Sequence, residues 1–246
     1  MIRRDIFFIL AVCLYGAVSS AFLFSESDQV NADYHTFLSV NRSYTTDSTV
    51  LVKQVIIKRS RNANTADTVY CLFHRKGQCV KIPAKTGAQY FFSSDQGYWL
   101  LTKKLRTPLK VSGAYKIEEF EVQDILKTDF ENSYQIISED KGILTLERKT
   151  EGPAYRFILF TKTAPDIFEL TFTDARKTPL RTLVYHRGTV GGYDCFRQID
   201  VYNLLFDKGG FSSWSTEWIK PVDVPASLFS YSQMKALGQK IDTLIE

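Results

Sequence analysis

The sequence predicts a mainly β protein built on one large antiparallel sheet, and three observations support this prediction. From residue 50 onward, β-branched and aromatic runs alternate with short polar turns, as in successive antiparallel strands. We expect about ten or more such strands. A single segment near residues 117–130 has helical spacing instead, which excludes the alternating helices of parallel βαβ units. A sheet of that size must curl, split into a sandwich or close on itself.

Residues 1–21 have the organisation of a signal peptide. Arg3 and Arg4 precede an apolar run over residues 6–15, and mostly small residues follow up to Ala21, after which we expect cleavage. The apolar run is shorter than the ~20 residues of a transmembrane helix. Residues 10–13 loosely resemble a lipobox, so lipidation of Cys13 is the alternative. Both alternatives export the chain from the cytoplasm.

The composition is that of a globular domain with a mild basic excess. Apolar residues make up 44% of the chain, which suffices for a core, and the net charge is +4. This charge is far below that of a dedicated nucleic-acid binder, so we expect no nucleic-acid partner. It is compatible with loose attraction to anionic lipid headgroups.

The elements follow in order. Residues 22–48 are polar with weak helical spacing and predict a short helix at most, ahead of a β domain over residues 49–246. Strands are predicted over residues 50–57, 68–73, 78–82, 89–92, 98–102, 134–137, 143–148, 155–160, 168–173, 180–185, 196–206 and 212–220. Along residues 168–173, apolar and polar side chains alternate, so this strand has one buried and one solvated face.

The helical segment has one apolar stripe. Ile117, Phe120 and Leu126 recur at helical spacings, and acidic residues between them crowd the first turns, where they favour the helix dipole. We therefore expect an amphipathic helix near residues 117–130 that covers the concave side of a curled sheet.

Two cysteines flank a predicted turn, and their pairing depends on its register. Cys71 and Cys79 could form a disulfide in an exported protein, but a turn centred on Lys76 and Gly77 would place Cys71 nearer Ile82. The sequence leaves both alternatives open. Cys195 is expected to be a small buried apolar residue.

Three segments resemble the outer-membrane lipoprotein-sorting family, which includes the LolA and LolB carriers. They are residues 87–106, residues 168–185 and residues 225–230, in the same order as in that family. The resemblance covers about residues 80–230. It implies an open, strongly curved antiparallel half-barrel with helices over its concave face. It also implies a monomeric periplasmic carrier of lipid or lipoprotein acyl chains, loaded by an inner-membrane transporter and unloaded at the outer membrane.

An apolar cavity is what such a carrier requires, because moving a sixteen-carbon acyl chain through water costs on the order of ten kcal/mol. The predicted cover residues are Ile117, Phe120 and Leu126. The predicted cavity residues are Tyr90, Phe92, Trp99, Leu101, Phe157, Leu159, Phe168, Leu170 and Phe172. Ordinary core packing is the alternative for each residue, and a one-residue error in strand parity would invert a whole face.

Two other classes of function compete with the carrier. His35, His74 and His186 are scattered, and no metal-ligand spacing, nucleophile motif or phosphate loop is present, so we expect neither catalysis nor a cofactor. A protein-binding module, such as an envelope-stress sensor on the same half-barrel, would need an exposed patch. Trp214, Trp218 and Pro221 are the candidates for that patch.

Overall fold

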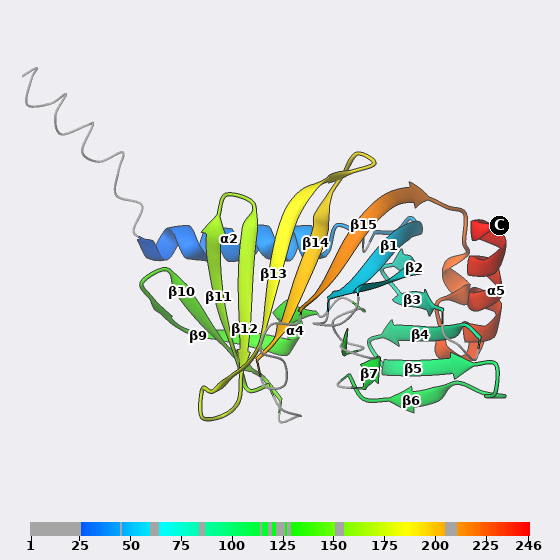
Figure 1. Ribbon diagram of the computed structural model, residues 1–246, viewed down its shortest axis with the longest axis horizontal. Coiled ribbons are helices and arrows are strands. Elements are labelled where there is room, and N and C mark those ends of the chain that lie inside the picture. Colours follow the sequence, from blue (N-terminus) through cyan, green and yellow to red (C-terminus); the bar gives the residue numbers. More distant parts are fainter. Residues whose placement is uncertain are drawn as a thin grey trace, which may run out of the picture.

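One open antiparallel sheet of 13 strands dominates the computed structural model (Figure 1). The structure describes residues 26–44, 46–59, 64–83, 87–113, 115–117, 120–121, 126, 129–150, 155–204 and 211–246. The predicted signal peptide and Cys13 lie outside these residues. Among the described residues, no helix is both long and apolar enough to cross a membrane.

The sheet consists of two meanders joined through β1 and β15. Its strand order is β6-β5-β4-β3-β2-β1-β15-β14-β13-β12-β11-β10-β9, so β6 and β9 are its two edges. The first meander contains β1 (Val50–Arg59), β2 (Asn64–His74), β3 (Gly77–Ile82), β4 (Gln89–Ser94), β5 (Gly97–Thr102) and β6 (Leu109–Val111). The second contains β9 (Tyr134–Asp140), β10 (Ile143–Arg148), β11 (Phe157–Ala164), β12 (Ile167–Thr173), β13 (Pro179–Val190), β14 (Tyr193–Asn203) and β15 (Phe211–Pro221).

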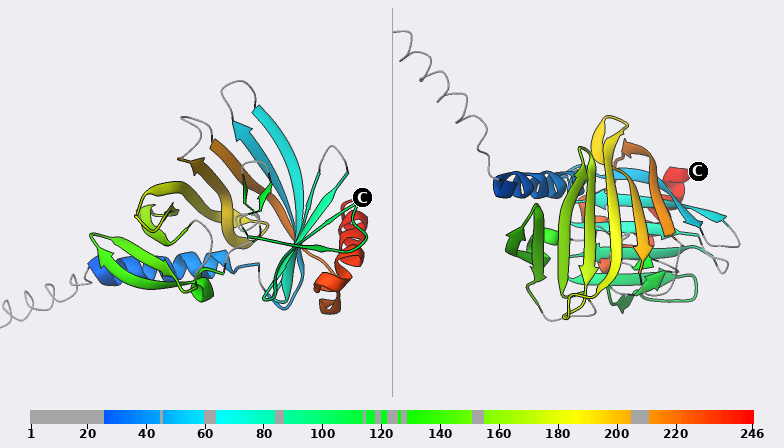
Figure 2. Two further views of the ribbon diagram at one scale, coloured as in Figure 1. Left: turned by 90° about the horizontal axis from the view of Figure 1, so that it is seen from below. Right: turned by 60° about the vertical axis from the view of Figure 1, so that its left-hand side comes forward.

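The sheet is strongly curved, and a helix packs on each of its faces (Figure 2). The helix α2 (Glu26–Asn41) lies on the concave face, whose core continues from Phe91 in the first meander to Phe168 in the second. The helix α5 (Met234–Ile245) follows two short 3-10 turns, η2 (Ala226–Leu228) and η3 (Tyr231–Gln233), and covers β2 to β5 on the convex face. The predicted open half-barrel is thus confirmed.

The N-terminal helix is longer than the sequence predicted. The helix α2 has 16 residues, and its side chains Tyr34, Phe37 and Leu38 are buried against the sheet. Its apolar stripe is hard to read from the sequence because Asp33 and Asn41 are buried as well. Tertiary packing, rather than a clean amphipathic pattern, accounts for this helix.

The predicted helix near residues 117–130 is wrong where the structure describes that segment. The strands β7 (Lys116–Ile117) and β8 (Phe120–Glu121) form a small hairpin, and only α4 (Phe130–Ser133) is helical. Ile117 and Phe120 are cross-strand partners in this hairpin. Apolar residues at positions i and i+3 therefore fit two structures, one face of a helix or the two ends of a two-residue turn.

The disulfide left open by the sequence does not form. His74 pairs with Gly77, so the turn centres one residue earlier than expected and Cys71 lies opposite Val80, while Cys79 lies opposite Leu72. The two thiols point to opposite faces of the sheet, Cys71 into the concave core and Cys79 beneath α5. Neither thiol is in a disulfide, nor is that of Cys195, and all three side chains are buried. Burial also raises the pKa of the Cys79 thiol.

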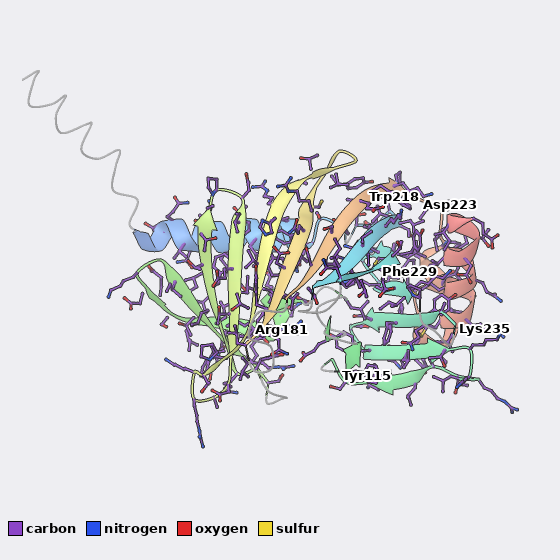
Figure 3. The ribbon with its side chains drawn as sticks, in the orientation of Figure 1. Tyr115, Arg181, Trp218, Asp223, Phe229 and Lys235 are labelled. Atoms are coloured by element: carbon purple, nitrogen blue, oxygen red, sulfur yellow. The ribbon has the colours of Figure 1, made fainter. Side chains whose placement is uncertain are left out.

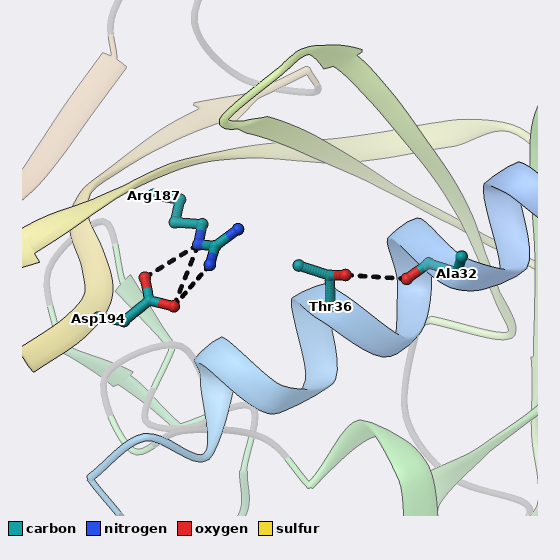
Figure 4. Close-up of polar contacts among 4 residues, drawn as sticks. All are labelled: Ala32, Thr36, Arg187 and Asp194. Carbon is teal, nitrogen blue, oxygen red and sulfur yellow. Dashed lines mark hydrogen bonds and ion pairs between the residues drawn. The ribbon is translucent and has the colours of Figure 1, made fainter.

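The β13–β14 hairpin is fixed near its tip by a bidentate ion pair (Figure 4). The Arg187 guanidinium donates from Nε to Oδ1 of Asp194 at 2.9 Å and from Nη2 to Oδ2 at 2.7 Å. These hydrogen bonds lower the pKa of the Asp194 carboxyl. The pair lies beyond a register shift between His186 and Arg187, and links the two strands on the far side of that irregularity.

Candidate ligand-binding face

The centre of the concave face is an aromatic cluster around Phe37 of α2. The Phe37 side chain is fully buried. Its ring centroid lies between 5.1 and 6.3 Å from the rings of Tyr34, Phe130, Phe160, Phe168, Tyr185 and Phe196. Four of these rings belong to strands β11 to β14, so one side chain of α2 occupies the hollow of the second meander. In this arrangement α2 itself fills the concave face of the second meander.

Polar contacts also hold α2 in place. Asp33 Oδ1 accepts a hydrogen bond from Lys162 Nζ of β11 at 2.7 Å, and Gln29 of the same helix also donates to it. After the end of α2, Arg42 forms an ion pair with Glu131 of α4, whose side chains are about half exposed. The half-exposed pair of Arg42 and Glu131 is screened by solvent and is worth at most about 1 kcal/mol. Apolar burial therefore provides most of the docking energy of α2.

One polar side chain of α2 is bonded within the helix itself. The Thr36 hydroxyl donates to the Ala32 carbonyl oxygen at 3.0 Å, one turn back within the helix (Figure 4). This hydroxyl has its hydrogen-bond partner within α2 and does not need one from the sheet. On the buried side, the Tyr34 ring packs edge-on against Phe160 at 5.1 Å. Burial raises the pKa of Tyr34 to about 12.

The segment between β6 and α4 covers the other part of the concave face. Leu126 is fully buried in the same core as Phe37, and the Tyr115 ring lies 6.2 Å from that of Phe91 in β4. Figure 3 labels Tyr115 beside the strands of the first meander. The described residues Tyr115 and Leu126 of this segment therefore pack against the sheet, and the strands β7 and β8 form a hairpin rather than a helix.

A buried polar cluster ties this covering segment to the second meander. Glu121 of β8 accepts a hydrogen bond from the Tyr155 hydroxyl at 2.8 Å, and its other oxygen lies 3.9 Å from Nη1 of Arg181 in β13 (Figure 3). The side chains of Arg181 and Glu121 are only 5% and 9% exposed. Burial raises the pKa of Tyr155, whose ring packs edge-on against Phe172. A charge pair thus lies at the border of the apolar face.

The predicted cavity residues do not share one face. Phe168, Leu170 and Phe172 point into the concave core, as predicted from their alternation. The residues of β4 and β5 lie under α5 instead: Tyr90, Phe92, Trp99 and Leu101. Phe157 and Leu159 are partly exposed on the outer face of β11, because the buried residues of that strand are Ile158 and Phe160. The parity of three strands was therefore predicted wrongly.

Of the predicted cover residues, Leu126 is buried in the concave core, and the backbones of Ile117 and Phe120 pair in the β7–β8 hairpin. The residues that sequence analysis missed are Tyr34 and Phe37 of α2, and Tyr185 and Phe196 of the sheet. The spacing of Tyr34, Phe37 and Leu38, which fits one face of a helix, is the sequence signal that could have revealed the two residues of α2.

The convex face carries a separate polar site. The Tyr90 hydroxyl donates to Asp242 of α5 at 2.8 Å, and Lys81 Nζ lies 2.7 Å from the same carboxylate. This cluster attaches α5 to β3 and β4. Burial raises the pKa of Tyr90, and its hydrogen bond to Asp242 raises the pKa further. The contacts are structural and lie away from the concave face.

A surface hollow of about 470 Å³ lies beside the ends of β1, β2 and β15. It is lined by polar groups that include Asp47, Thr49, His74 and Asp223. The His74 ring is buried, stacks on Phe229 at 4.9 Å and accepts a hydrogen bond at Nδ1 from the Lys76 amide. Burial lowers the pKa of His74. Two carboxylates in the lining make this hollow unsuited to an acyl chain.

The residues considered for other functions are dispersed. His35 is exposed on α2, His74 lies at the end of β2, and His186 contacts Asp200 on β14 at 3.0 Å. Among the side chains that the structure describes, no three His, Cys, Asp or Glu residues could hold a metal ion together. Trp214 is buried in the concave core, so it cannot form an exposed patch with Trp218.

Comparison with known proteins supports the fold and gives no close relative. No protein-family model matches the chain, and no curated protein matches it in sequence. Solved structures do match. A LolA superfamily protein from Nitrosomonas europaea is 17% identical, with a TM-score of 0.60 over 79% of this chain and 96% of that chain.

Two further structures have the same architecture. A domain assigned to outer membrane lipoprotein sorting from Vibrio parahaemolyticus is 14% identical, with a TM-score of 0.58 over 80% of this chain and 97% of its own. A DUF1329 family protein from Desulfovibrio piger is 15% identical, with a TM-score of 0.60 over 83% and 98% of the two chains. The resemblance predicted from the sequence is confirmed at the level of the fold.

Proposed function

We propose, on the premise of a fold shared with lipoprotein-sorting proteins, that this protein is a periplasmic carrier. It binds the acyl chains of a lipid or lipoprotein on the concave face and transfers them from an inner-membrane donor toward the outer membrane. The observation that carries the proposal is the aromatic face beneath α2, which is fully apolar at its centre and is occupied by a single helix. The chain performs no chemistry on its cargo.

Ligand entry requires α2 to move, because its side chains occupy the space an acyl chain would need. The helix buries five apolar side chains in the concave core: Val30, Tyr34, Phe37, Leu38 and Val40. At about 1.5–3 kcal/mol each, these side chains contribute on the order of 10 kcal/mol. A sixteen-carbon chain buried in their place returns a similar amount, at about 0.8 kcal/mol per methylene.

This near balance is what a carrier needs. A face that stayed empty would expose a large apolar surface to water, and a face that bound cargo far more tightly than α2 would not release it. Because α2 and the acyl chain compete for the same apolar surface, either one covers that surface when the other leaves. Binding is then set by differences of a few kcal/mol, which a donor or an acceptor can supply.

The test combines ligand mapping with a matched pair of variants. The purified protein is incubated with a diazirine-bearing fatty acid, and labelled peptides are identified by mass spectrometry. We expect labelling within β11 to β13 and none within α5. In parallel, Ile158→Asn on the concave face of β11 should weaken binding of a fluorescent fatty acid by about tenfold or more. Leu159→Asn, one residue along on the outer face, should leave binding within twofold.

Circular dichroism and thermal melting of both variants separate lost binding from lost folding. The proposal is wrong if the unmodified protein takes up no fatty acid, or if labelling falls on α5 while β11 to β13 stay unlabelled. Equal loss in two folded variants would also count against it, because the two side chains lie on opposite faces of one strand.

A further inference from the structure

One edge of the sheet gathers exposed basic side chains. Lys103, Lys104 and Arg106 follow β5, and Lys110 is the central residue of β6, the edge strand. All four are exposed, and the nearest acidic residues in the sequence are Asp95 and Glu118. We call these four residues the basic edge.

Apolar side chains are exposed among these charges. Leu109, beside Lys110, is 53% exposed, and Tyr231 is 47% exposed. The Tyr231 ring stacks on Trp99 at 5.2 Å, and Lys110 Nζ lies 5.9 Å above the same indole. Exposed apolar side chains close to lysine are typical of surfaces that lie against a bilayer, where apolar tips enter the interface and cations meet headgroups.

The strand register places this edge at the rim of the concave face. Leu109 is the partner of Leu100, which belongs to the concave core, so both side chains lie on the same side of the sheet. Lys110 is the partner of Trp99 on the convex side. The basic edge therefore presents charges along the border of the sheet and its leucine toward the hollow that α2 and the covering segment occupy.

The edge is poorly suited to a partner protein that would extend the sheet. The strand β6 has only three residues and carries a lysine at its centre, and both features disfavour the addition of another strand. A bilayer requires no strand pairing and no shape-complementary groove. Exposed positive charge matches the negative, laterally mobile headgroups of anionic lipids.

We propose that the basic edge docks the protein on anionic membrane surfaces, with Leu109 as its apolar anchor and the rim of the concave face against the lipid. This inference deepens the proposed carrier function by naming the surface that meets a membrane, although docking itself can be measured without any cargo. Such an orientation would let an acyl chain pass between the bilayer and the concave face without crossing bulk water.

The experiment is vesicle co-sedimentation of the mature chain. Vesicles of phosphatidylcholine with about a third phosphatidylglycerol should bind the protein at low salt, and vesicles of pure phosphatidylcholine should bind it much less. Binding should weaken as salt shortens the screening length, which is about 10 Å at 0.1 M. The triple variant K103Q/K104Q/R106Q should lower the partition coefficient about a hundredfold, which corresponds to about 1 kcal/mol per basic residue.

A control variant removes the same charge elsewhere. K141Q/R176Q/K177Q changes three exposed basic residues in the turns of the second meander and should lower partitioning far less. Leu109→Asn should weaken binding while keeping the salt dependence. The proposal is wrong if the protein stays unbound with anionic vesicles at low salt, if both triple variants lose the same affinity, or if binding requires a membrane protein. Vesicle binding with no fatty-acid uptake would overturn the carrier function and leave the docking surface intact.

Discussion

Replacing Phe37 by alanine tests whether α2 competes with ligand for the concave face. The Phe37 side chain is fully buried and touches six aromatic rings. A Phe→Ala change at such a site costs about 3–5 kcal/mol. If α2 docks as a unit, this cost falls on its docking and raises the population with α2 displaced by about a hundredfold to several thousandfold.

A ligand that needs α2 to leave should then bind more tightly by up to the same factor. The assay is titration of a fluorescent fatty acid into the unmodified protein and Phe37→Ala, with hydrogen exchange of α2 as an independent measure of its opening. A cavity alone could attract the probe, so the control is Phe92→Ala. Phe92 is also fully buried, but under α5.

The competition model predicts tighter binding for Phe37→Ala and unchanged binding for Phe92→Ala. Unchanged or weaker binding of the probe to a folded Phe37→Ala protein, with faster exchange in α2, would refute the reasoning. That outcome would mean that α2 opens without creating the ligand site.

Three further predictions concern stability. Glu121→Ala should lower the free energy of unfolding by about 3–5 kcal/mol in urea titrations, since it leaves the Arg181 charge buried. The control is Glu147→Ala, which breaks a more exposed pair with Arg156 and should cost about 1 kcal/mol or less. Because burial raises the pKa of Tyr34 to about 12, the folded state holds this proton more tightly than the unfolded chain, whose tyrosine pKa is about 10. The contribution of this proton to the free energy of unfolding, about 3 kcal/mol, is complete below pH ~10 and is lost as the pH rises through ~12. Tyr34→Phe should therefore flatten the dependence of stability on pH in that window, and identical alkaline profiles of the two proteins would contradict this prediction. Gly77→Ala should destabilise the protein by about 1–3 kcal/mol in thermal melts, because its Cβ would lie 2.8 Å from the Ser93 carbonyl oxygen. In Gly188→Ala the new Cβ meets the flexible Arg197 side chain, so this variant should cost less in the same melts.

The sequence allowed prediction of the strands but not of which face each side chain occupies. Alternation along β12 was clear, since Phe168, Leu170 and Phe172 are separated by polar residues, and their face was predicted correctly. In β4 and β5 both faces are apolar, because α5 covers the convex side of these strands. Periodicity carries no information where both faces are buried, so the parity of Phe92 and Trp99 could not be derived.

The helices were harder to predict for a related reason. The docking of α2 depends on aromatic residues supplied by distant strands, above all Tyr185 and Phe196, and its own pattern contains the buried polar residues Asp33 and Asn41. For the covering segment a helix was predicted where none forms. Its acidic residues and i, i+3 spacing matched a helix, but the described strands β7 and β8 form a hairpin. In both cases tertiary contacts outweighed local propensity.

The two meanders differ in thickness, and this difference has a mechanical consequence. The strands β2 to β5 are enclosed between the concave core and α5, so neighbouring residues such as Cys71 and Leu72 are both fully buried, on opposite sides. The strands β11 to β13 have a core on one side only, and the residues on their other side are mostly partly exposed. A close-packed interior resists deformation. We therefore expect the α5 half to behave as a stiff wall, and the interior to widen by flattening of the thinner half, in concert with the departure of α2.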